Sequence, residues 1–324
     1  MNGAIEGREL ISVTVGGIYV QGTCHRSQDD VSSSQSGFGR RNRTGVLFLN
    51  HGFLPRAAPG DSAVYWADSF AKAGYPSFRF DLPGFGDSDG DVPNQLLNFV
   101  NSGGYASILS AIIKELVGRF SLSGVVIMGH CAGAVTALFT ASACKECRGL
   151  VLTDPYFFLQ HERTSIRIEL SHWTSWSRLG ALAADIYYFL KYFRLLIRRN
   201  RPPGNANLAL LRCWNQLASS GMPILVLMAP VFKTRSFKPR IGEFDYLGYL
   251  RALSGRGSRV VVQFIEGTNH SFADVEGRAA VRQRTGDWLN VCFPTGGLGK
   301  STTPDPPRQP HGEDSDECAY HATA

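Results

Sequence analysis

The stretch that most constrains the fold of this chain is Gly129-His130-Cys131-Ala132-Gly133, which stands between two apolar runs. Residues 124–128 are typical of a buried strand, and residues 134–139 are typical of a tightly packed helix. A strand that passes directly into a helix needs a sharp turn, and a side chain at its centre leaves room only for small residues two positions away on each side. Gly129 and Gly133 meet this demand, so the pattern predicts a strained turn that presents the thiol of Cys131.

Strand and helix patterns alternate along most of the chain. Apolar and polar residues alternate over 9–22, and Gly16-Gly17 divides this stretch in two. The pattern predicts a hairpin of two strands near the amino terminus. Such alternation of buried strands and helices predicts an α/β fold, with a mostly parallel central sheet and helices on both faces. Further strands are predicted at residues 45–53, 75–81, 149–155, 222–228 and 259–265, and helices at residues 61–73, 104–120, 243–253 and 276–291.

The alternation stops between residues 156 and 221, which contain no clear strand. Leu179, Leu182, Ile186 and Leu190 recur there at helical spacing, so we expect a helical lid inserted after the sixth strand. The apolar stripe is too interrupted for a membrane span. The expected organisation is a core of residues 1–155 and 222–292, the lid over 156–221, and a disordered tail over 293–324, where Pro, Gly, Ser and Thr dominate.

The net charge of +6 comes partly from two arginine clusters, at residues 40–43 and 198–201. We interpret both as solvated loop charge, so neither nucleic-acid binding nor stable membrane insertion is expected. The seven cysteines are an odd number and widely spread, and no signal peptide opens the chain, which predicts free thiols in the cytoplasm.

No resident metal or cofactor is expected from the sequence. Cys144 and Cys147 form a C-x-x-C, but no second pair completes a zinc site. No phosphate-binding glycine motif follows a strand, so no nucleotide cofactor is implied.

Cys131 has the features of a nucleophile. The thiolate is the reactive form of cysteine, and the amino terminus of the following helix favours a negative charge. A nearby base must take the thiol proton, and His270 follows the last predicted strand, in a position suited to a general base. His51 and His130 flank the site in sequence and are expected to shape it.

Four ordered motifs resemble the α/β-hydrolase superfamily: His51-Gly52, the Asp81-Leu82-Pro83-Gly84-Phe85-Gly86-Asp87-Ser88 turn, the turn around Cys131, and Asn269-His270-Ser271-Phe272. The resemblance covers residues 44–155 and 222–292. The lid, the cysteine and the closing stretch 281–289 look most similar to the bacterial exosortase-system-associated hydrolases, within a serine aminopeptidase-like and thioesterase-like branch.

The resemblance implies a Cys–His–Asp triad whose acid usually follows the strand ending at Met228. The expected motif is displaced, and Asp245 is the first candidate, with Glu243 and Asp154 as alternatives. The two oxyanion-hole donors would be the backbone N–H groups of Phe53 and Ala132. Asp81, Asp87 and Ser88 are expected to satisfy backbone groups in a tight turn rather than to act in catalysis.

These features together predict a hydrolase or acyltransferase that acts through a covalent acyl-cysteine intermediate. The substrate would be a small acyl ester or thioester, free or bound to a carrier protein or CoA. The alternative is a non-catalytic protein of the same fold that binds a small molecule. Trapping of Cys131 by a thiol reagent discriminates between the two.

Overall fold

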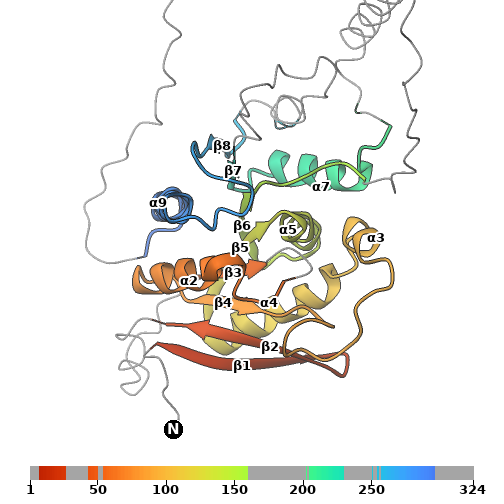
Figure 1. Ribbon diagram of the computed structural model, residues 1–324, viewed down its shortest axis with the longest axis vertical. Coiled ribbons are helices and arrows are strands. Elements are labelled where there is room, and N and C mark those ends of the chain that lie inside the picture. Colours follow the sequence, from red (N-terminus) through yellow and green to blue (C-terminus); the bar gives the residue numbers. More distant parts are fainter. Residues whose placement is uncertain are drawn as a thin grey trace, which may run out of the picture.

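One mixed sheet of eight strands forms the centre of the protein, in the spatial order β1-β2-β4-β3-β5-β6-β7-β8 (Figure 1). The computed structural model describes residues 7–26, 43–49, 54–159, 202, 204–229, 250, 254 and 257–295. The predicted α/β-hydrolase fold, with a mostly parallel sheet, is confirmed.

The amino-terminal hairpin joins β1 (Arg8–Val15) to β2 (Ile18–His25) in antiparallel register. Gly16 and Gly17 lie between them at positive φ, 58° and 83°, a conformation that glycine adopts without steric cost. β2 then pairs antiparallel with β4 (Ser77–Phe80). The predicted hairpin is confirmed, and its second strand extends to His25, beyond the expected end.

The remaining strands run parallel: β3 (Arg43–Leu49), β5 (Leu122–His130), β6 (Cys147–Thr153), β7 (Ile224–Met228) and β8 (Val260–Phe264). Parallel strands end at one edge of the sheet, so the residues that follow β5, β6 and β8 meet there although they are far apart in the chain.

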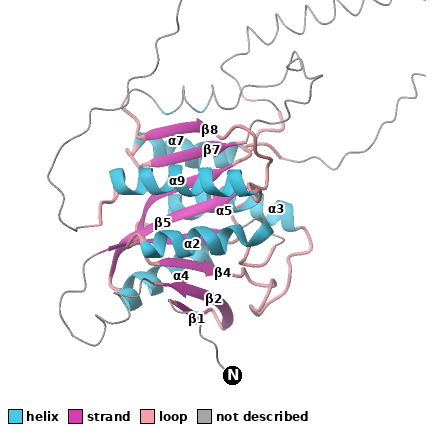
Figure 2. Cartoon of the chain, turned by 60° about the vertical axis from the view of Figure 1, so that its left-hand side comes forward, coloured by secondary structure: helices cyan, strands magenta, loops and turns pink. Residues whose placement is uncertain are grey.

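Helices cover both faces of the sheet (Figure 2). On one face lie α2 (Ser62–Lys72), which follows the short 3₁₀ turn η1 (Pro59–Asp61), and α9 (Val275–Cys292). On the other lie α3 (Leu96–Asn101), α4 (Ala106–Phe120), α5 (Ala132–Ala143) and α7 (Leu208–Ser219). Helix α3 has no counterpart among the helices predicted from the sequence.

The alternation of side chains along β5 divides the core in two. Val126 and Met128 pack with the aromatic residues of α2 and α9, whereas Val125 and Ile127 pack with α4, α5 and α7. Successive residues of a strand point to opposite faces, so a strand covered on both sides is apolar throughout. This explains the uninterrupted apolar runs in the sequence.

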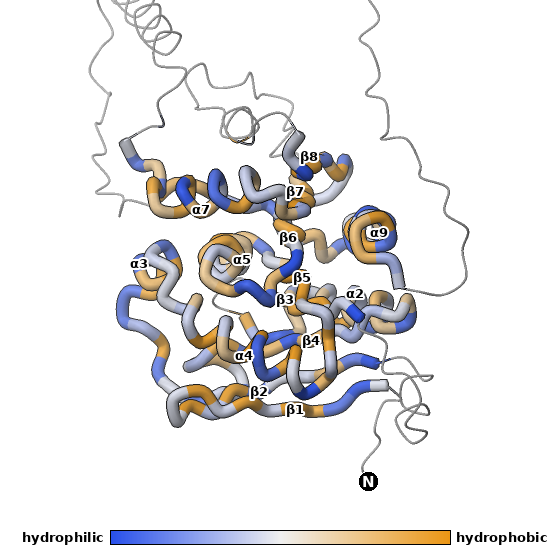
Figure 3. The backbone as a smooth tube through the Cα atoms, turned by 180° about the vertical axis from the view of Figure 1, so that it is seen from behind, coloured by the Kyte–Doolittle hydropathy of each residue, from blue (hydrophilic) through white to orange (hydrophobic). Residues whose placement is uncertain are grey.

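Helix α7 falls inside the range predicted as a lid, and it packs against α5 on the sheet core. Its Leu210, Trp214 and Leu217 are buried, and hydrophobic and hydrophilic residues alternate along it (Figure 3). The rest of the lid range lies outside the described residues except for 156–159, 202, 204–207 and 220–221. Of the expected tail only residues 293–295 are described.

Most of the helix expected at residues 243–253 also lies outside the described residues. Among the helices that are described, none is both long enough and apolar enough to cross a lipid bilayer.

Candidate active site

Cys131 lies at the junction of β5 and α5 with strained backbone angles, φ 50° and ψ −113°. A positive φ is uncommon for a residue with a Cβ, and such strain persists only where the surroundings enforce it. The Cys131 N–H donates to the carbonyl of Thr153 at 3.0 Å, and its own carbonyl accepts from the N–H of Ala134, also at 3.0 Å. The sharp turn predicted from the sequence is confirmed.

Gly129 is required for this turn by the space around it. A Cβ at Gly129 would lie 2.5 Å from the carbonyl oxygen of Gly133 and 2.7 Å from Cα of Ala134. These are backbone atoms of the following helix, so they cannot move aside as a flexible side chain would. The glycine therefore allows α5 to start directly against the end of β5.

His270 lies after β8 in a folded loop that turns around Asn269. The N–H of Phe272 donates to the Asn269 carbonyl at 3.1 Å, and the N–H of Ser271 donates to Asn269 Oδ1 at 2.9 Å. Phe272 is fully buried, and its ring packs edge-on against that of His130, with 6.0 Å between the centroids. This anchor holds the imidazole of His270 at the sheet edge where β5 and β6 end.

Asp154, directly after β6, faces His270. Its Oδ2 lies 2.9 Å from Nδ1 of His270, and its Oδ1 accepts the N–H of Ala229 at 2.7 Å. The backbone of Asp154 has a positive φ of 44°, and its N–H donates to the carbonyl oxygen of Leu227 at 2.9 Å. Because β6 and β7 are neighbours, the end of β7 holds this carboxylate in place.

The pKa of His270 is raised to about 10, first by the hydrogen bond to Asp154 and then by a hydrogen bond to Cys131. The ring is therefore an imidazolium at neutral pH, and both of its nitrogens are donors. One nitrogen faces a carboxylate, and the ring also interacts with the sulfur. A histidine in contact with both a carboxylate and a cysteine sulfur is the arrangement that nucleophilic catalysis by cysteine requires.

His130, which was expected to shape the site, lies beside His270. It is buried, and its Nδ1 lies 2.9 Å from Oγ1 of Thr153, which in turn donates to the carbonyl of Gly129 at 3.3 Å. Thr153 has one hydroxyl proton, so Nδ1 of His130 is the donor in their contact. The ring centroid of His130 lies 5.0 Å from that of His270.

Tyr156 is a neighbour of the site that the sequence did not indicate. Its pKa is raised to about 12, by burial first and by the charge of Cys131 second. The phenol therefore stays neutral and keeps its proton at physiological pH.

The structure brings together Cys131, His270 and Asp154 from the sequence-predicted set, and Ala132 begins α5 directly after the turn. The first N–H groups of a helix have no partner within the helix, which suits Ala132 to an oxyanion hole. Phe53, Asp245 and Glu243 lie outside the described residues.

Within the described ranges, no three His, Cys, Asp or Glu side chains come together to hold a metal ion. Cys144 and Cys147 are both buried, and burial raises the pKa of each thiol, for Cys147 to about 12. These two thiols are therefore poor nucleophiles and poor ligands.

Comparison with known proteins gives one family match, described as "Alpha/beta hydrolase family", over residues 46–284. No curated protein sequence matches the chain. Many solved structures are similar to this chain, and three of them illustrate the likeness in fold at low sequence identity.

An esterase of Pyrococcus furiosus is 13% identical with a TM-score of 0.53, over 88% of this chain and 91% of its own. A serine hydrolase homologue of Coxiella burnetii is 14% identical with a TM-score of 0.51, over 87% of this chain and 97% of its own. A thioesterase domain from the curacin biosynthetic pathway is 14% identical with a TM-score of 0.50, over 86% of this chain and 98% of its own.

Proposed function

Because this chain belongs to the alpha/beta hydrolase family, we propose that it is a hydrolase or acyltransferase of esters or thioesters, with Cys131, His270 and Asp154 as its triad. The observation that carries the proposal is the contact of His270 with Asp154 on one side and with Cys131 on the other. A nucleophile, a base and a group that orients the base are the parts that acyl transfer needs.

In the first half-reaction the Cys131 thiolate attacks the carbonyl carbon of the substrate, and the carbonyl oxygen becomes negatively charged. The N–H groups of Ala132 and Phe53 would stabilise that oxygen. The intermediate collapses, the bond to the leaving group breaks, and the His270 imidazolium gives its proton to the departing thiolate or alkoxide. The product is an acyl-cysteine thioester.

In the second half-reaction neutral His270 takes a proton from water or another acceptor while that molecule attacks the thioester. The acyl group leaves Cys131, whose sulfur departs as the thiolate that His270 again stabilises. Asp154 holds the ring in the required tautomer through Nδ1 and stabilises its positive charge.

We assign the acid role to Asp154 because, among the described residues, its carboxylate is the one in contact with His270. Asp245 and Glu243 lie outside the described residues. The finer resemblance to exosortase-system-associated hydrolases stays a prediction, as do the lid, the substrate carried on CoA or a carrier protein, and the reducing cytoplasmic location.

The test is turnover by the wild type, Cys131→Ala and His270→Ala against a panel of acyl-CoA thioesters, N-acetylcysteamine thioesters and p-nitrophenyl esters. We expect release of thiol or phenol by the wild type, and a loss of at least about 10³-fold in kcat in both variants. Equal turnover by Cys131→Ala would contradict a cysteine nucleophile. Binding without turnover across the whole panel would identify the non-catalytic alternative.

A further inference from the structure

A side-chain hydrogen bond closes the loop that carries His270. The hydroxyl of Thr268, before the histidine, donates to Oδ2 of Asp274, after it, at 2.6 Å. Inside the closed loop, Oδ1 of Asn269 accepts from the hydroxyl of Ser271 at 2.6 Å. The loop therefore has hydrogen bonds across His270 that do not involve the imidazole, and its shape does not depend on the contacts of that ring.

Asp274 joins this loop to helix α9. It is the N-cap of α9, and its Oδ1 accepts the N–H of Gly277 at 2.7 Å while its Oδ2 holds Thr268. Burial opposes ionisation of this carboxyl, but hydrogen bonds from Thr268 and from the backbone N–H groups of Gly277 and Asn269 hold its pKa below the ordinary value. The group is therefore a carboxylate at neutral pH, with one oxygen for the helix and the other for the loop.

The first turn of α9 leaves room for Thr268 because position 277 is glycine. A Cβ at Gly277 would lie 2.2 Å from Oγ1 of Thr268 and 2.9 Å from each carboxylate oxygen of Asp274. Glycine is a poorer helix former than alanine by about 0.5–1 kcal/mol. The helix thus carries a less favourable residue at the position where the loop hydroxyl meets it.

The start of α9 is itself bonded to the elements beside it. Nε1 of Trp66 in α2 donates to the carbonyl of Arg278 at 2.9 Å, and Nη1 of Arg278 donates to the carbonyl of Gly60 in η1 at 2.9 Å. The guanidinium also lies over the ring of Tyr65, 5.3 Å from its centroid. Asp274 therefore attaches the His270 loop to a helix end that α2 and η1 hold in place.

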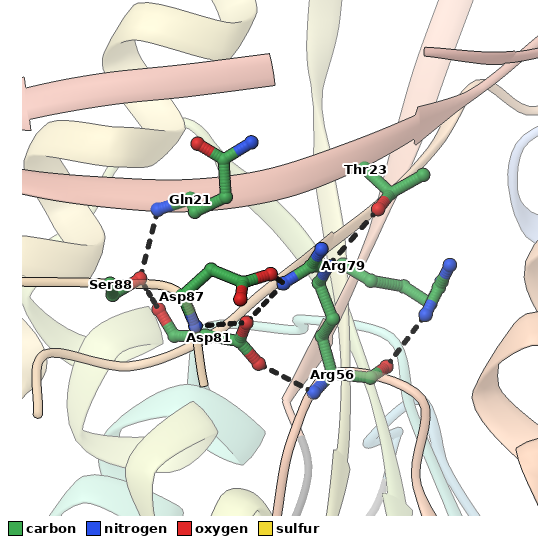
Figure 4. A network of polar contacts seen from close by, with 7 residues as sticks. All are labelled: Gln21, Thr23, Arg56, Arg79, Asp81, Asp87 and Ser88. Carbon is green, nitrogen blue, oxygen red and sulfur yellow. Dashed lines mark hydrogen bonds and ion pairs between the residues drawn. The ribbon is translucent and has the colours of Figure 1, made fainter. Parts of the chain in front are cut away.

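The segment that leads into η1 is anchored in turn by Arg56 (Figure 4). The N–H of Arg56 donates to Oδ1 of Asp81 at 2.6 Å, and its guanidinium pairs with Asp81 and donates to Oδ2 of Asp87 at 2.8 Å. Asp81 also accepts the N–H of Asp87 at 3.2 Å, so the turn after β4 satisfies its own backbone groups and holds Arg56 as well. The support of the His270 loop thus reaches the central sheet.

The side chain of His270 is more than half exposed, so its place depends on the backbone that carries it. We propose that Thr268 and Asp274 are positioning residues for acyl transfer, because their hydrogen bond closes the loop that carries the catalytic imidazole. This inference rests on the proposed function. Displacement of a reacting group by about 1 Å can cost about 10²-fold in rate, so loss of the closing hydrogen bond has a kinetic consequence.

Three variants separate this role from the capping of α9. Thr268→Val removes the hydroxyl at nearly constant volume, and Thr268→Ser restores it. Asp274→Ser keeps an N-cap, because serine caps helices about as well as aspartate, but it has no second oxygen for Thr268. The matched control is Thr44→Val, which removes a side-chain hydrogen bond of 3.2 Å to Ser123 at the amino end of β3, on the opposite edge of the sheet.

We expect kcat with one acyl thioester to fall about 10- to 100-fold in Thr268→Val and Asp274→Ser, with KM within about threefold. Thr268→Ser should recover kcat to within about threefold of wild type, and Thr44→Val should stay in that range. The pKa of the His270 ring, followed by NMR without substrate, should fall below about 10 in the two impaired variants, because the hydrogen bond to Asp154, the largest cause of its raised value, is loosened.

Wild-type kcat in either Thr268→Val or Asp274→Ser, or a His270 ring that titrates in them as in the wild type, would overturn the inference and leave the proposed function intact. An equal loss of kcat in Thr268→Ser or Thr44→Val would do the same, since the loss would not depend on this hydrogen bond. A wild type that turns over no ester or thioester would overturn the proposed function, and the inference with it.

Discussion

Nδ1 of His270 lies 2.9 Å from Oδ2 of Asp154, although 116 residues separate the two in the chain. The pair forms because β6 and β8 end at the same edge of the sheet, with β7 between them. Asp154 is nearly buried, with a side chain 6% exposed, whereas the side chain of His270 is 55% exposed. The carboxylate is thus a fixed, partly desolvated partner for a ring that remains accessible to substrate.

Replacement of Asp154 by Asn should lower kcat/KM by about 10²- to 10⁴-fold, because the ring loses its charged partner and its required tautomer. Asp245→Asn and Glu243→Gln are matched controls that also remove one carboxylate, and each should stay within about threefold of wild type. Steady-state kinetics with one thioester across the three variants checks this. A large loss in Asp245→Asn with Asp154→Asn near wild type would assign the acid to Asp245.

The protonation of His270 can be followed directly. Its ring should titrate near pH 10 in an NMR experiment, and Asp154→Asn should lower that pKa because the hydrogen bond to Asp154 is the largest cause of the shift. A raised histidine pKa stabilises the folded state fully below the unfolded value of about 6.5, and this contribution is lost as the pH rises through about 10. Titration of His270 near pH 6.5 in the wild type would refute the imidazolium assignment.

Buried His25 makes the protein sensitive to acid. Its pKa of about 4 lies below the unfolded value of about 6.5, so the unfolded chain binds more protons between these values and stability falls as the pH drops through that window. Protonation also removes the acceptor that Nε of Arg79 uses. Tm measured from pH 7 to pH 4 should decline less steeply in His25→Gln than in the wild type. Parallel pH curves would show that His25 is not the responsible group.

Gly129→Ala should destabilise the protein by about 1–3 kcal/mol or prevent folding, since the added methyl meets backbone atoms of α5. Gly118→Ala is the matched control, because a Cβ there meets nothing within 4 Å and the position lies within helix α4. That control should be stabilised by about 0.5–1 kcal/mol. Chemical denaturation of both variants measures the difference, and equal stabilities would contradict the steric account of the turn.

The fold was largely predictable because its signals are local. The apolar run before Cys131 and the glycines around it indicated a strand, a sharp turn and a helix, and β5 and α5 meet in that way. The amino-terminal hairpin could be predicted in the same way, because Gly16 and Gly17 separate its two strands in the sequence. Short helix α3 was missed because six residues carry little periodicity.

The site was less predictable because its partners are set by strand order. Asp154 was one of three candidate acids, and only the adjacency of β6 and β7 gives its carboxylate the Ala229 N–H and a place facing His270. The ion pair between Arg56 and Asp81 was not predicted, since nothing in the loop sequence indicates it. The position of Tyr156 near Cys131 was not predicted either. Contacts between loops at one sheet edge depend on tertiary structure that local patterns do not encode.

The central claim, that Cys131 forms a covalent acyl intermediate, is tested most directly by intact-mass spectrometry. The wild-type protein is mixed with a short-chain acyl thioester, quenched in acid within the first turnover and mapped by peptide. We predict a mass increase equal to one acyl group, located on the peptide with Cys131, removed by hydroxylamine and absent from Cys131→Ala. Turnover without any adduct, or an adduct on another cysteine such as Cys213, would contradict the account.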